Sequence, residues 1–289
     1  MSMNHKVCLV TGANSGVGKA TALGLAELGA TVVMLCRNRE RGEAARDEII
    51  SRSGNSRIDL MLADLSEQAS IREFVTAFKS KYDRLHVLSH NAGVVLMNRQ
   101  TSSDGIEKIL AINYLSRFLL TILLLDVLKQ SSPARITNVS GPPAALKMAR
   151  INFDDIQFEE RFNWMQANTQ VLLAGVLFTF ELAARLKGTG VTANAFFPGV
   201  VRSNITQNLS WYMSFFPKMI QPFFAEKCKT SVYLASSPEV ENISGKFFVN
   251  KKVVEINSNY AGEANRAKLW AISETLTQTQ KIRQEATNG

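Results

Sequence analysis

The stretch Thr11-Gly-Ala-Asn-Ser-Gly-Val-Gly18 decides the fold, because it joins an apolar strand-like run to a stretch with helical periodicity. Lys6 to Thr11 is predicted to form a strand, and a helix is predicted from Val17 onward. Glycines at such a junction let the backbone approach a pyrophosphate, and the helix start offers unpaired N–H groups and the positive end of its dipole. The loop therefore predicts a dinucleotide site, made by Gly12, Asn14, Ser15, Gly16, Val17 and Gly18.

Strand-length apolar runs alternate with helical stretches along the rest of the chain. Further strands are expected at Thr31 to Cys36, Arg57 to Ala63, Leu85 to His90, Ala134 to Ser140, Val191 to Phe197 and Gly245 to Val249. Long helices are expected from about Asp104 to Lys129, around Asn168 and Leu172, and from Ala261 to Gln280. The alternation predicts an α/β fold, a Rossmann-type doubly wound parallel sheet of about seven strands with flanking helices.

Length and composition limit the alternatives. A chain of 289 residues, 46% hydrophobic and 20% charged, fits a single domain over residues 1–289 and is short for two. Only six residues precede Val7, and no uninterrupted apolar run reaches the roughly 18 residues of a membrane span, so a soluble, cytoplasmic protein is expected. The net charge of +8 is dispersed, which argues against nucleic-acid binding. The three cysteines have no metal-site spacing.

The end of the second expected strand predicts which dinucleotide is bound. An acidic residue there would bond a ribose 2′-hydroxyl, whereas an arginine would accept a 2′-phosphate. The strand ends Cys36-Arg37-Asn38-Arg39, without a carboxylate. Arg37 therefore favours NADP(H), although a solvated arginine on a loop would look the same.

Several further motifs give the chain a family resemblance over nearly its whole length. Besides the glycine loop they are Asp64-Leu65, Asn91-Ala-Gly93, Asn113, Arg135-Ile-Thr-Asn-Val-Ser140, Glu181-Leu-Ala-Ala-Arg-Leu186 and Pro198-Gly199. With them the chain resembles the short-chain dehydrogenase/reductase family, most closely its retinol-dehydrogenase-like branch. The resemblance implies that Asp64 and Leu65 lie near the adenine and that Asn91, Ala92 and Gly93 support the strand ends beside the cofactor. It also implies cofactor contacts from Pro198, Gly199 and Val200.

The same resemblance exposes a departure at the reaction centre. The family register places its serine at Gly141, its tyrosine at Asn168 and its lysine at Leu172, and only Asn113 is retained. No tyrosine occurs between Tyr114 and Tyr212, so a shifted alignment does not restore one. A carboxamide has no proton to exchange near neutral pH, and leucine supplies neither charge nor hydrogen bond. Interconversion of alcohols and ketones by the family mechanism is therefore not expected.

Some polar side chains remain around this centre. Asn113, Asn168, Ser140 and Gln166 are candidates to orient a ligand without exchanging a proton. His90, next to Asn91, is the only nearby side chain that titrates near neutrality, which makes it the candidate replacement acid. A lone histidine at a strand end more often satisfies a local hydrogen bond, so a structural role is favoured.

Residues 202–226 are aromatic and irregular, with Trp211, Phe215 and Phe216 among them. The resemblance places the substrate-binding segment here, and its apolar side chains indicate a hydrophobic small molecule under a lid. A peripheral membrane contact or a homo-oligomer interface would use the same composition.

Three hypotheses stay open. The first is an atypical enzyme on a hydrophobic small molecule, either redox-neutral or transferring hydride to an acceptor that needs no tyrosine. The second is a non-catalytic nucleotide- or ligand-binding protein. The third is a conventional oxidoreductase in which His90 replaces the missing acid.

Overall fold

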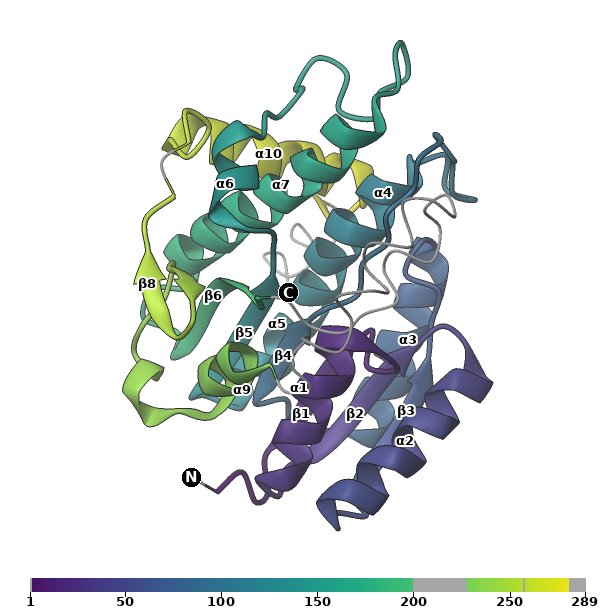
Figure 1. Ribbon diagram of the computed structural model, residues 1–289, viewed down its shortest axis with the longest axis vertical. Coiled ribbons are helices and arrows are strands. Elements are labelled where there is room, and N and C mark those ends of the chain that lie inside the picture. The colour runs from purple at the N-terminus through teal and green to yellow at the C-terminus, as the bar shows by residue number, and fades with distance from the viewer. Residues whose placement is uncertain (1, 200–227, 257, 281–289) are drawn as a thin grey trace, which may run out of the picture.

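The strands form one sheet in the order β3-β2-β1-β4-β5-β6-β7-β8. The computed structural model describes residues 2–199, 228–256 and 258–280 (Figure 1). The strands are β1 Val7–Thr11, β2 Thr31–Cys36, β3 Ile58–Leu62, β4 Val87–His90, β5 Ala134–Val139, β6 Val191–Phe197, β7 Phe247–Val249 and β8 Lys252–Val254. All neighbouring strands pair in parallel except β8, which runs antiparallel to β7. The predicted doubly wound sheet is confirmed, with β8 added at its edge.

Helices cover both faces of the sheet (Figure 1). One face carries α1 Gly16–Glu27, α2 Arg39–Ser53 and α9 Lys229–Ser236. The other carries α3 Gln68–Lys81, α5 Ser116–Gln130, α7 Trp164–Arg185 and α10 Glu263–Leu276. Shorter elements are α4 Lys108–Leu110, the π-helical turn η1 Ala111–Leu115, α6 Pro143–Met148 and η3 Pro238–Val240. Each face buries the apolar stripe of its helices against the apolar strands.

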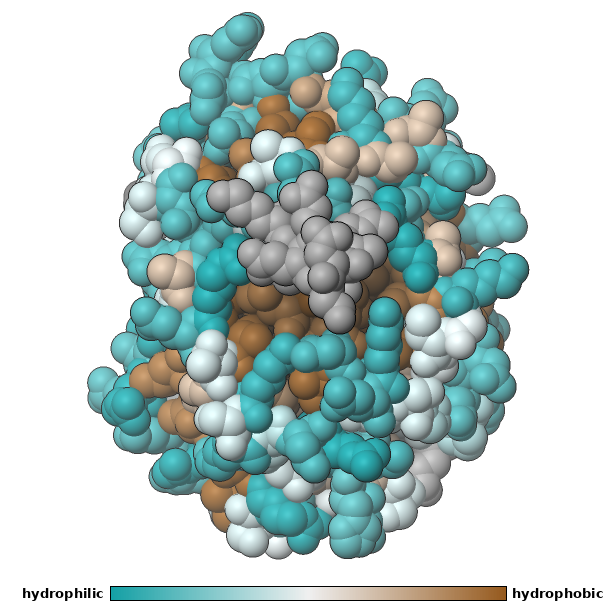
Figure 2. Space-filling model, turned by 180° about the vertical axis from the view of Figure 1, so that it is seen from behind, coloured by the Kyte–Doolittle hydropathy of each residue, from teal (hydrophilic) through white to brown (hydrophobic). Residues whose placement is uncertain are grey.

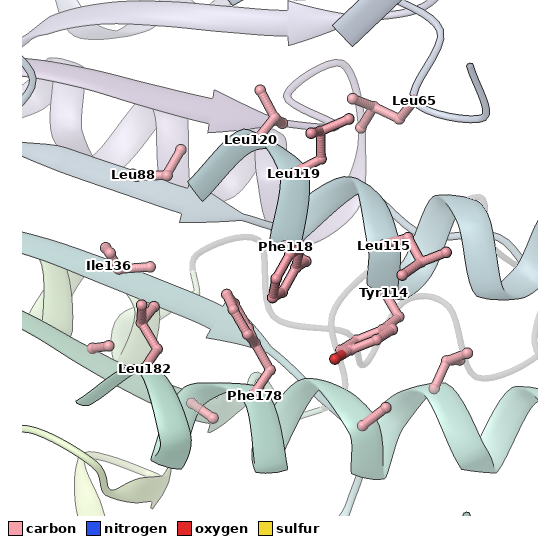
Figure 3. Close-up of a cluster of buried hydrophobic side chains, with 14 of the residues drawn as sticks. Leu65, Leu88, Tyr114, Leu115, Phe118, Leu119, Leu120, Ile136, Phe178 and Leu182 are labelled. Atoms are coloured by element: carbon pink, nitrogen blue, oxygen red, sulfur yellow. The ribbon is translucent and has the colours of Figure 1, made fainter. Parts of the chain in front are cut away.

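The larger core lies between the sheet and α5 and α7 (Figure 3). Tyr114 and Phe118 from η1 and α5 point toward Phe178 of α7, and all three side chains are buried. Trp270 of α10 joins them, with its ring centroid 5.0 Å from that of Phe118 and 6.0 Å from that of Phe178. This aromatic cluster fixes α7, whose first turns carry two of the candidate site residues.

Helix boundaries differ from the prediction in two places. The helix expected from Asp104 begins at Lys108 and passes through η1, where the backbone takes one wider turn before α5. The C-terminal helix, expected over 261–280, spans Glu263–Leu276. α6 was not predicted, although Pro142 and Pro143 at its start suit the first turn of a helix.

Among the described residues, two helical stretches are long and apolar enough to cross a membrane, although charged side chains interrupt each of them. They are Lys108–Gln130, with a mean hydropathy of 1.7, and Trp164–Arg185, with 1.3. In the fold, 78% and 67% of their apolar windows are buried. Core helices pass the same test, so this is weak support for a membrane span. Figure 2 shows the face of the molecule behind the view of Figure 1, where apolar side chains gather among polar ones.

Candidate active site

The candidate site lies where the parallel strands end. β1 pairs with β2 on one side and β4 on the other, so the strand order reverses there. Ligands of open α/β sheets bind beyond the carboxyl ends of the strands at such a point. The loops after β1 to β6 bring the predicted residues to this one edge, with Gly12, Arg37, Asp64, Asn91, Ser140 and Pro198 each following a different strand.

The glycine loop requires its glycines. Gly12 has φ +64°, and a Cβ there would lie 2.9 Å from the Ala92 Cα. Gly16 has φ +53°, and a side chain on Gly18 would collide with the Gly12 carbonyl oxygen. The Thr11 hydroxyl accepts hydrogen bonds from the Asn91 and Ala92 N–H groups, at 2.9 and 3.1 Å. The ends of β1 and β4 are thereby held together, and the loop presents bare backbone.

The residues at this edge fit a dinucleotide. The N-cap of α1, Ser15, makes no side-chain capping hydrogen bond, which leaves the first N–H groups of α1 without a side-chain cap. Asn91 donates to the Ser89 carbonyl and hydroxyl, while its buried Oδ1 has no partner among the described residues. Asp64 Oδ1 accepts from the Ser66 N–H and hydroxyl, which fixes this carboxylate after β3. Arg37 is exposed at the end of β2, as a contact to a 2′-phosphate requires.

The positions that resemble the family's serine and lysine sites pack on each other. Gly141 follows β5, and a Cβ on it would lie 2.6 Å from Cδ1 of Leu172, so the leucine fills the space a serine side chain needs. The Ser140 hydroxyl donates to the Leu172 carbonyl oxygen at 3.0 Å. Glycine and leucine are therefore sterically matched, and neither can move a proton.

Asn168, at the expected tyrosine position, donates both side-chain hydrogen bonds to backbone carbonyl oxygens. Its Nδ2 donates to the Trp164 carbonyl oxygen at 2.7 Å and to the Leu96 carbonyl oxygen at 3.2 Å. Its Oδ1 is buried and has no partner among the described residues. An unpaired buried acceptor costs roughly 1–3 kcal/mol. A hydrogen-bond donor on a ligand would pair with Oδ1 and remove this penalty.

Asn113 lies in η1 and ties this turn to the loop after β4. Its Oδ1 accepts from the Val94 N–H and its Nδ2 donates to the Val94 carbonyl oxygen, both at 2.8 Å. Both ends of the amide are thus engaged, and the side chain is buried. The geometry supports a positioning role for Asn113, with the loop at Gly93 and Val94 as its target.

His90 lies in the core, and its environment argues against the role of replacement acid. It is 1% exposed, and its Nε2 lies 3.0 Å from the Thr121 hydroxyl. Burial, and then the positive charge of Arg117, lower its pKa to about 3. The imidazole is therefore neutral at physiological pH, and its remaining N–H is too weak an acid to serve as the proton donor.

Arg117 is a buried cation that the sequence reading did not single out. Its Nη1 donates to the Val139 carbonyl oxygen at 2.6 Å, and burial lowers its pKa to about 10. A Cβ on Gly175 would lie 3.0 Å from the same Nη1, so the guanidinium passes close against α7. A lone arginine directly before the largely apolar stretch Phe118 to Leu125 was the available signal.

Of the predicted substrate residues, Gln166 lies in the described part of the chain. Gln166 lines a polar hollow of about 440 Å³ near the start of α7, and neither Asn113 nor Asn168 lines it. The other residues of its wall are Asn152, Asp154, Asp155, Phe158, Glu160, Arg161 and Asn163. Gly199, with φ +75°, follows β6 as expected. Val200, Trp211, Phe215 and Phe216, and with them the proposed lid, lie outside the described residues.

Known proteins resemble this chain at the level of the sequence and of the fold. A family model described as short chain dehydrogenase matches residues 6–151. The chain is 40% identical to retinol dehydrogenase 12 of Mus musculus over 93% of this chain and 85% of that protein. It is 38% identical to retinol dehydrogenase 14 of Homo sapiens, over 95% and 87%. The crystal structure of a putative uncharacterized protein from Mycobacterium paratuberculosis superposes with a TM-score of 0.76 at 30% identity, over 96% and 95%.

Proposed function

Because the chain belongs to the short-chain dehydrogenase family, we propose that it binds NADP(H) and acts on an apolar small molecule without the Ser-Tyr-Lys proton-transfer group. The observation that carries this proposal is the packing of Leu172 against Gly141. These two residues supply neither a hydroxyl nor a cation. Asn168 completes the departure, since an amide cannot act as an acid or base near neutral pH. When bound, the cofactor supplies a hydride donor or acceptor.

The reaction class follows from what these side chains can do. Without a proton donor, the chain can hold a ligand in one orientation, exclude water and set its distance from the cofactor. Orientation alone is worth roughly 7–11 kcal/mol of a reaction barrier. A redox-neutral rearrangement, or hydride transfer to an acceptor such as an iminium carbon or conjugated alkene, fits these means.

A second candidate is a conventional alcohol dehydrogenase, favoured by the identity of 40% to retinol dehydrogenase 12. A third is a binding protein without activity, favoured by the way Leu172 closes the space beside Gly141.

Steady-state turnover separates these candidates. All-trans-retinol with NADP⁺, and all-trans-retinal with NADPH, should give no measurable turnover with the wild-type protein. The triple variant Gly141→Ser, Asn168→Tyr, Leu172→Lys should recover weak activity, and each single variant should not, because such groups act as a unit. Robust turnover by the wild type would overturn the proposal and establish the conventional enzyme. Native mass spectrometry of freshly purified protein tests the third candidate. A binding protein without activity would carry a bound ligand and leave it chemically unchanged.

The cofactor half of the proposal rests on Arg37 and is tested by titration calorimetry. NADPH should bind about tenfold or more tightly than NADH, because a guanidinium pairs with the 2′-phosphate by charge-assisted hydrogen bonds. Arg37→Asp should abolish or reverse that preference. Arg84→Asp is the matched control. Arg84 is exposed and precedes β4, so it lies at the amino ends of the strands, whereas Arg37 lies at their carboxyl ends. Equal affinity for both dinucleotides in the wild type would remove the assignment to NADP(H).

Location and assembly stay predictions. We propose a cytoplasmic protein whose segment 202–226 covers the ligand, with a membrane-surface contact or a homo-oligomer contact as alternatives for that segment. Analytical ultracentrifugation beside vesicle flotation separates them, because only an oligomer sediments faster in the absence of lipid.

A further inference from the structure

We propose that the reaction centre receives a neutral hydrogen-bond donor of an apolar ligand, a hydroxyl or amide-type N–H, and that Asn168 Oδ1 is its acceptor. This inference rests on the proposed function and names the ligand class of the same site. It reverses the hydrogen-bond polarity that a carbonyl substrate needs, since a carbonyl oxygen can only accept.

Within the described residues, the side-chain donors of Ser140, Asn113 and Asn168 are already in use. The Ser140 hydroxyl donates to the Leu172 carbonyl oxygen, and Asn113 Nδ2 donates to the Val94 carbonyl oxygen. Asn168 Nδ2 donates to two carbonyl oxygens, those of Trp164 and Leu96. A carbonyl ligand would therefore have to displace one of these bonds to find a donor.

The free hydrogen-bonding capacity that remains on Asn168 is an acceptor. Its Oδ1 is buried without a partner among the described residues. The two carbonyl oxygens that face Nδ2 cannot donate, so turning the amide over would set Oδ1 against both of them and lose the two hydrogen bonds of Nδ2. The neighbouring bonds therefore fix the orientation of the amide and leave Oδ1 as its free acceptor.

The charges near the centre favour a neutral ligand. Leu172 offers no cation that would stabilise a developing negative charge on oxygen. Arg117 lies against Gly175, one turn along α7 from Leu172, and its buried charge disfavours a second cation nearby. A neutral donor meets neither objection.

Binding of matched alcohol and carbonyl pairs tests the inference in the absence of added cofactor, so that no turnover intervenes. The probes are all-trans-retinol with all-trans-retinal, and farnesol with farnesal, measured by tryptophan fluorescence. The alcohol should bind about tenfold more tightly within a pair, the factor that corresponds to roughly 1.4 kcal/mol. Retinyl methyl ether, which has the retinoid skeleton but no donor, should bind like the aldehyde.

Two variants assign the preference to one atom. Asn168→Leu removes the acceptor at similar volume and should bring the alcohol-to-aldehyde ratio to about one. Asn168→Gln keeps a carboxamide with an acceptor oxygen and should retain a preference for the alcohol. Thermal unfolding and NADPH affinity of both variants establish that they are folded.

The outcomes distinguish this inference from the function on which it rests. If NADPH binds but the aldehydes bind as tightly as the alcohols, or if neither alcohol binds, the donor-binding inference is overturned and the cofactor assignment stands. The same holds if Asn168→Leu keeps the preference. If alcohols are preferred but the wild type also oxidises them rapidly with NADP⁺, the proposed function fails while the polarity of Asn168 is upheld.

Discussion

At the scale of single residues, Gly141 and Leu172 depend on each other. Gly141→Ser should lower the free energy of unfolding by about 1 kcal/mol, the low end of overpacking costs, because the leucine tip can turn away. With Leu172→Ala already present, the same serine should be nearly neutral. Urea unfolding of the four proteins in the cycle measures the coupling. Gly262→Ser is the control for adding a serine side chain without overpacking. Nothing lies within 4 Å of the Cβ position of Gly262, and serine suits this residue's place as the N-cap of α10. Additive effects in the cycle would show that the two positions are independent.

His90 should make the free energy of unfolding depend on pH. Its pKa falls from 6.5 to about 3 in the folded protein, chiefly through burial. As the pH drops from about 6.5 toward 3, the unfolded chain takes up a proton at this histidine that the folded protein does not. The free energy of unfolding therefore declines, by at most about 1.4 kcal/mol per pH unit, and His90 has no effect above pH 6.5.

Urea unfolding at pH 7 and pH 5 checks this on the wild type and His90→Gln. The difference between the two proteins isolates His90, because the half-buried His86, whose pKa is lowered to about 4, is common to both. The wild type should lose more stability than the variant on acidification. The same loss in both proteins would show that His90 titrates normally, and would restore it as a candidate acid.

At the scale of elements, η1 depends on the two bonds between Asn113 and Val94. Asn113→Ala should leave the Val94 N–H and carbonyl unpaired, at roughly 1–3 kcal/mol for each, toward the low end because Val94 is half-buried. Asn113→Asp keeps the acceptor. Hydrogen exchange at the Val94 amide should therefore accelerate in the alanine variant and stay slow in the aspartate variant. Equal protection in the wild type and Asn113→Ala would contradict the positioning role.

Which elements the sequence could predict depends on how local their causes are. β1 and α1 follow from apolar runs and the glycine loop, which are properties of neighbouring residues. β8 is three residues long and follows a turn at Asn250 and Lys251, both with positive φ, so its signal is too short to recognise. The π-helical turn η1 could not be predicted from neighbouring residues. It is accompanied by a hydrogen bond from the Val94 N–H to Asn113, and Val94 lies in a different segment of the chain.

The reaction centre illustrates the same limit. The family register identified Gly141, Asn168 and Leu172 as positions of interest. That the leucine fills the space beside the glycine, and that both donors of Asn168 are spent on Leu96 and Trp164, depends on contacts between segments far apart in the chain. Residue type alone therefore indicated that these three side chains cannot exchange a proton. The three-dimensional packing was needed to show that the hydrogen-bonding atom of Asn168 still without a partner is an acceptor.

At the scale of the whole molecule, the core that stabilises the fold lies apart from the carboxyl ends of the strands, which carry the residues proposed to bind the cofactor. Trp270 packs on Phe118 and Phe178, with the Arg185 guanidinium 4.1 Å from the centre of its ring. Gly12 instead lies at the carboxyl end of β1. Stability and cofactor affinity should therefore respond to different substitutions.

Trp270→Ala should lower the free energy of unfolding by roughly 3–5 kcal/mol, the usual cost of removing a large buried aromatic side chain. The affinity of the folded protein for NADPH should change less than about twofold, the ring lying among helices rather than at the strand ends. Gly12→Ala should do the opposite, because its φ of +64° and the 2.9 Å approach to the Ala92 Cα force the cofactor loop to move. Urea unfolding and titration calorimetry of both variants give the comparison. A large loss of NADPH affinity in folded Trp270→Ala would show that α10 and the cofactor edge are energetically coupled.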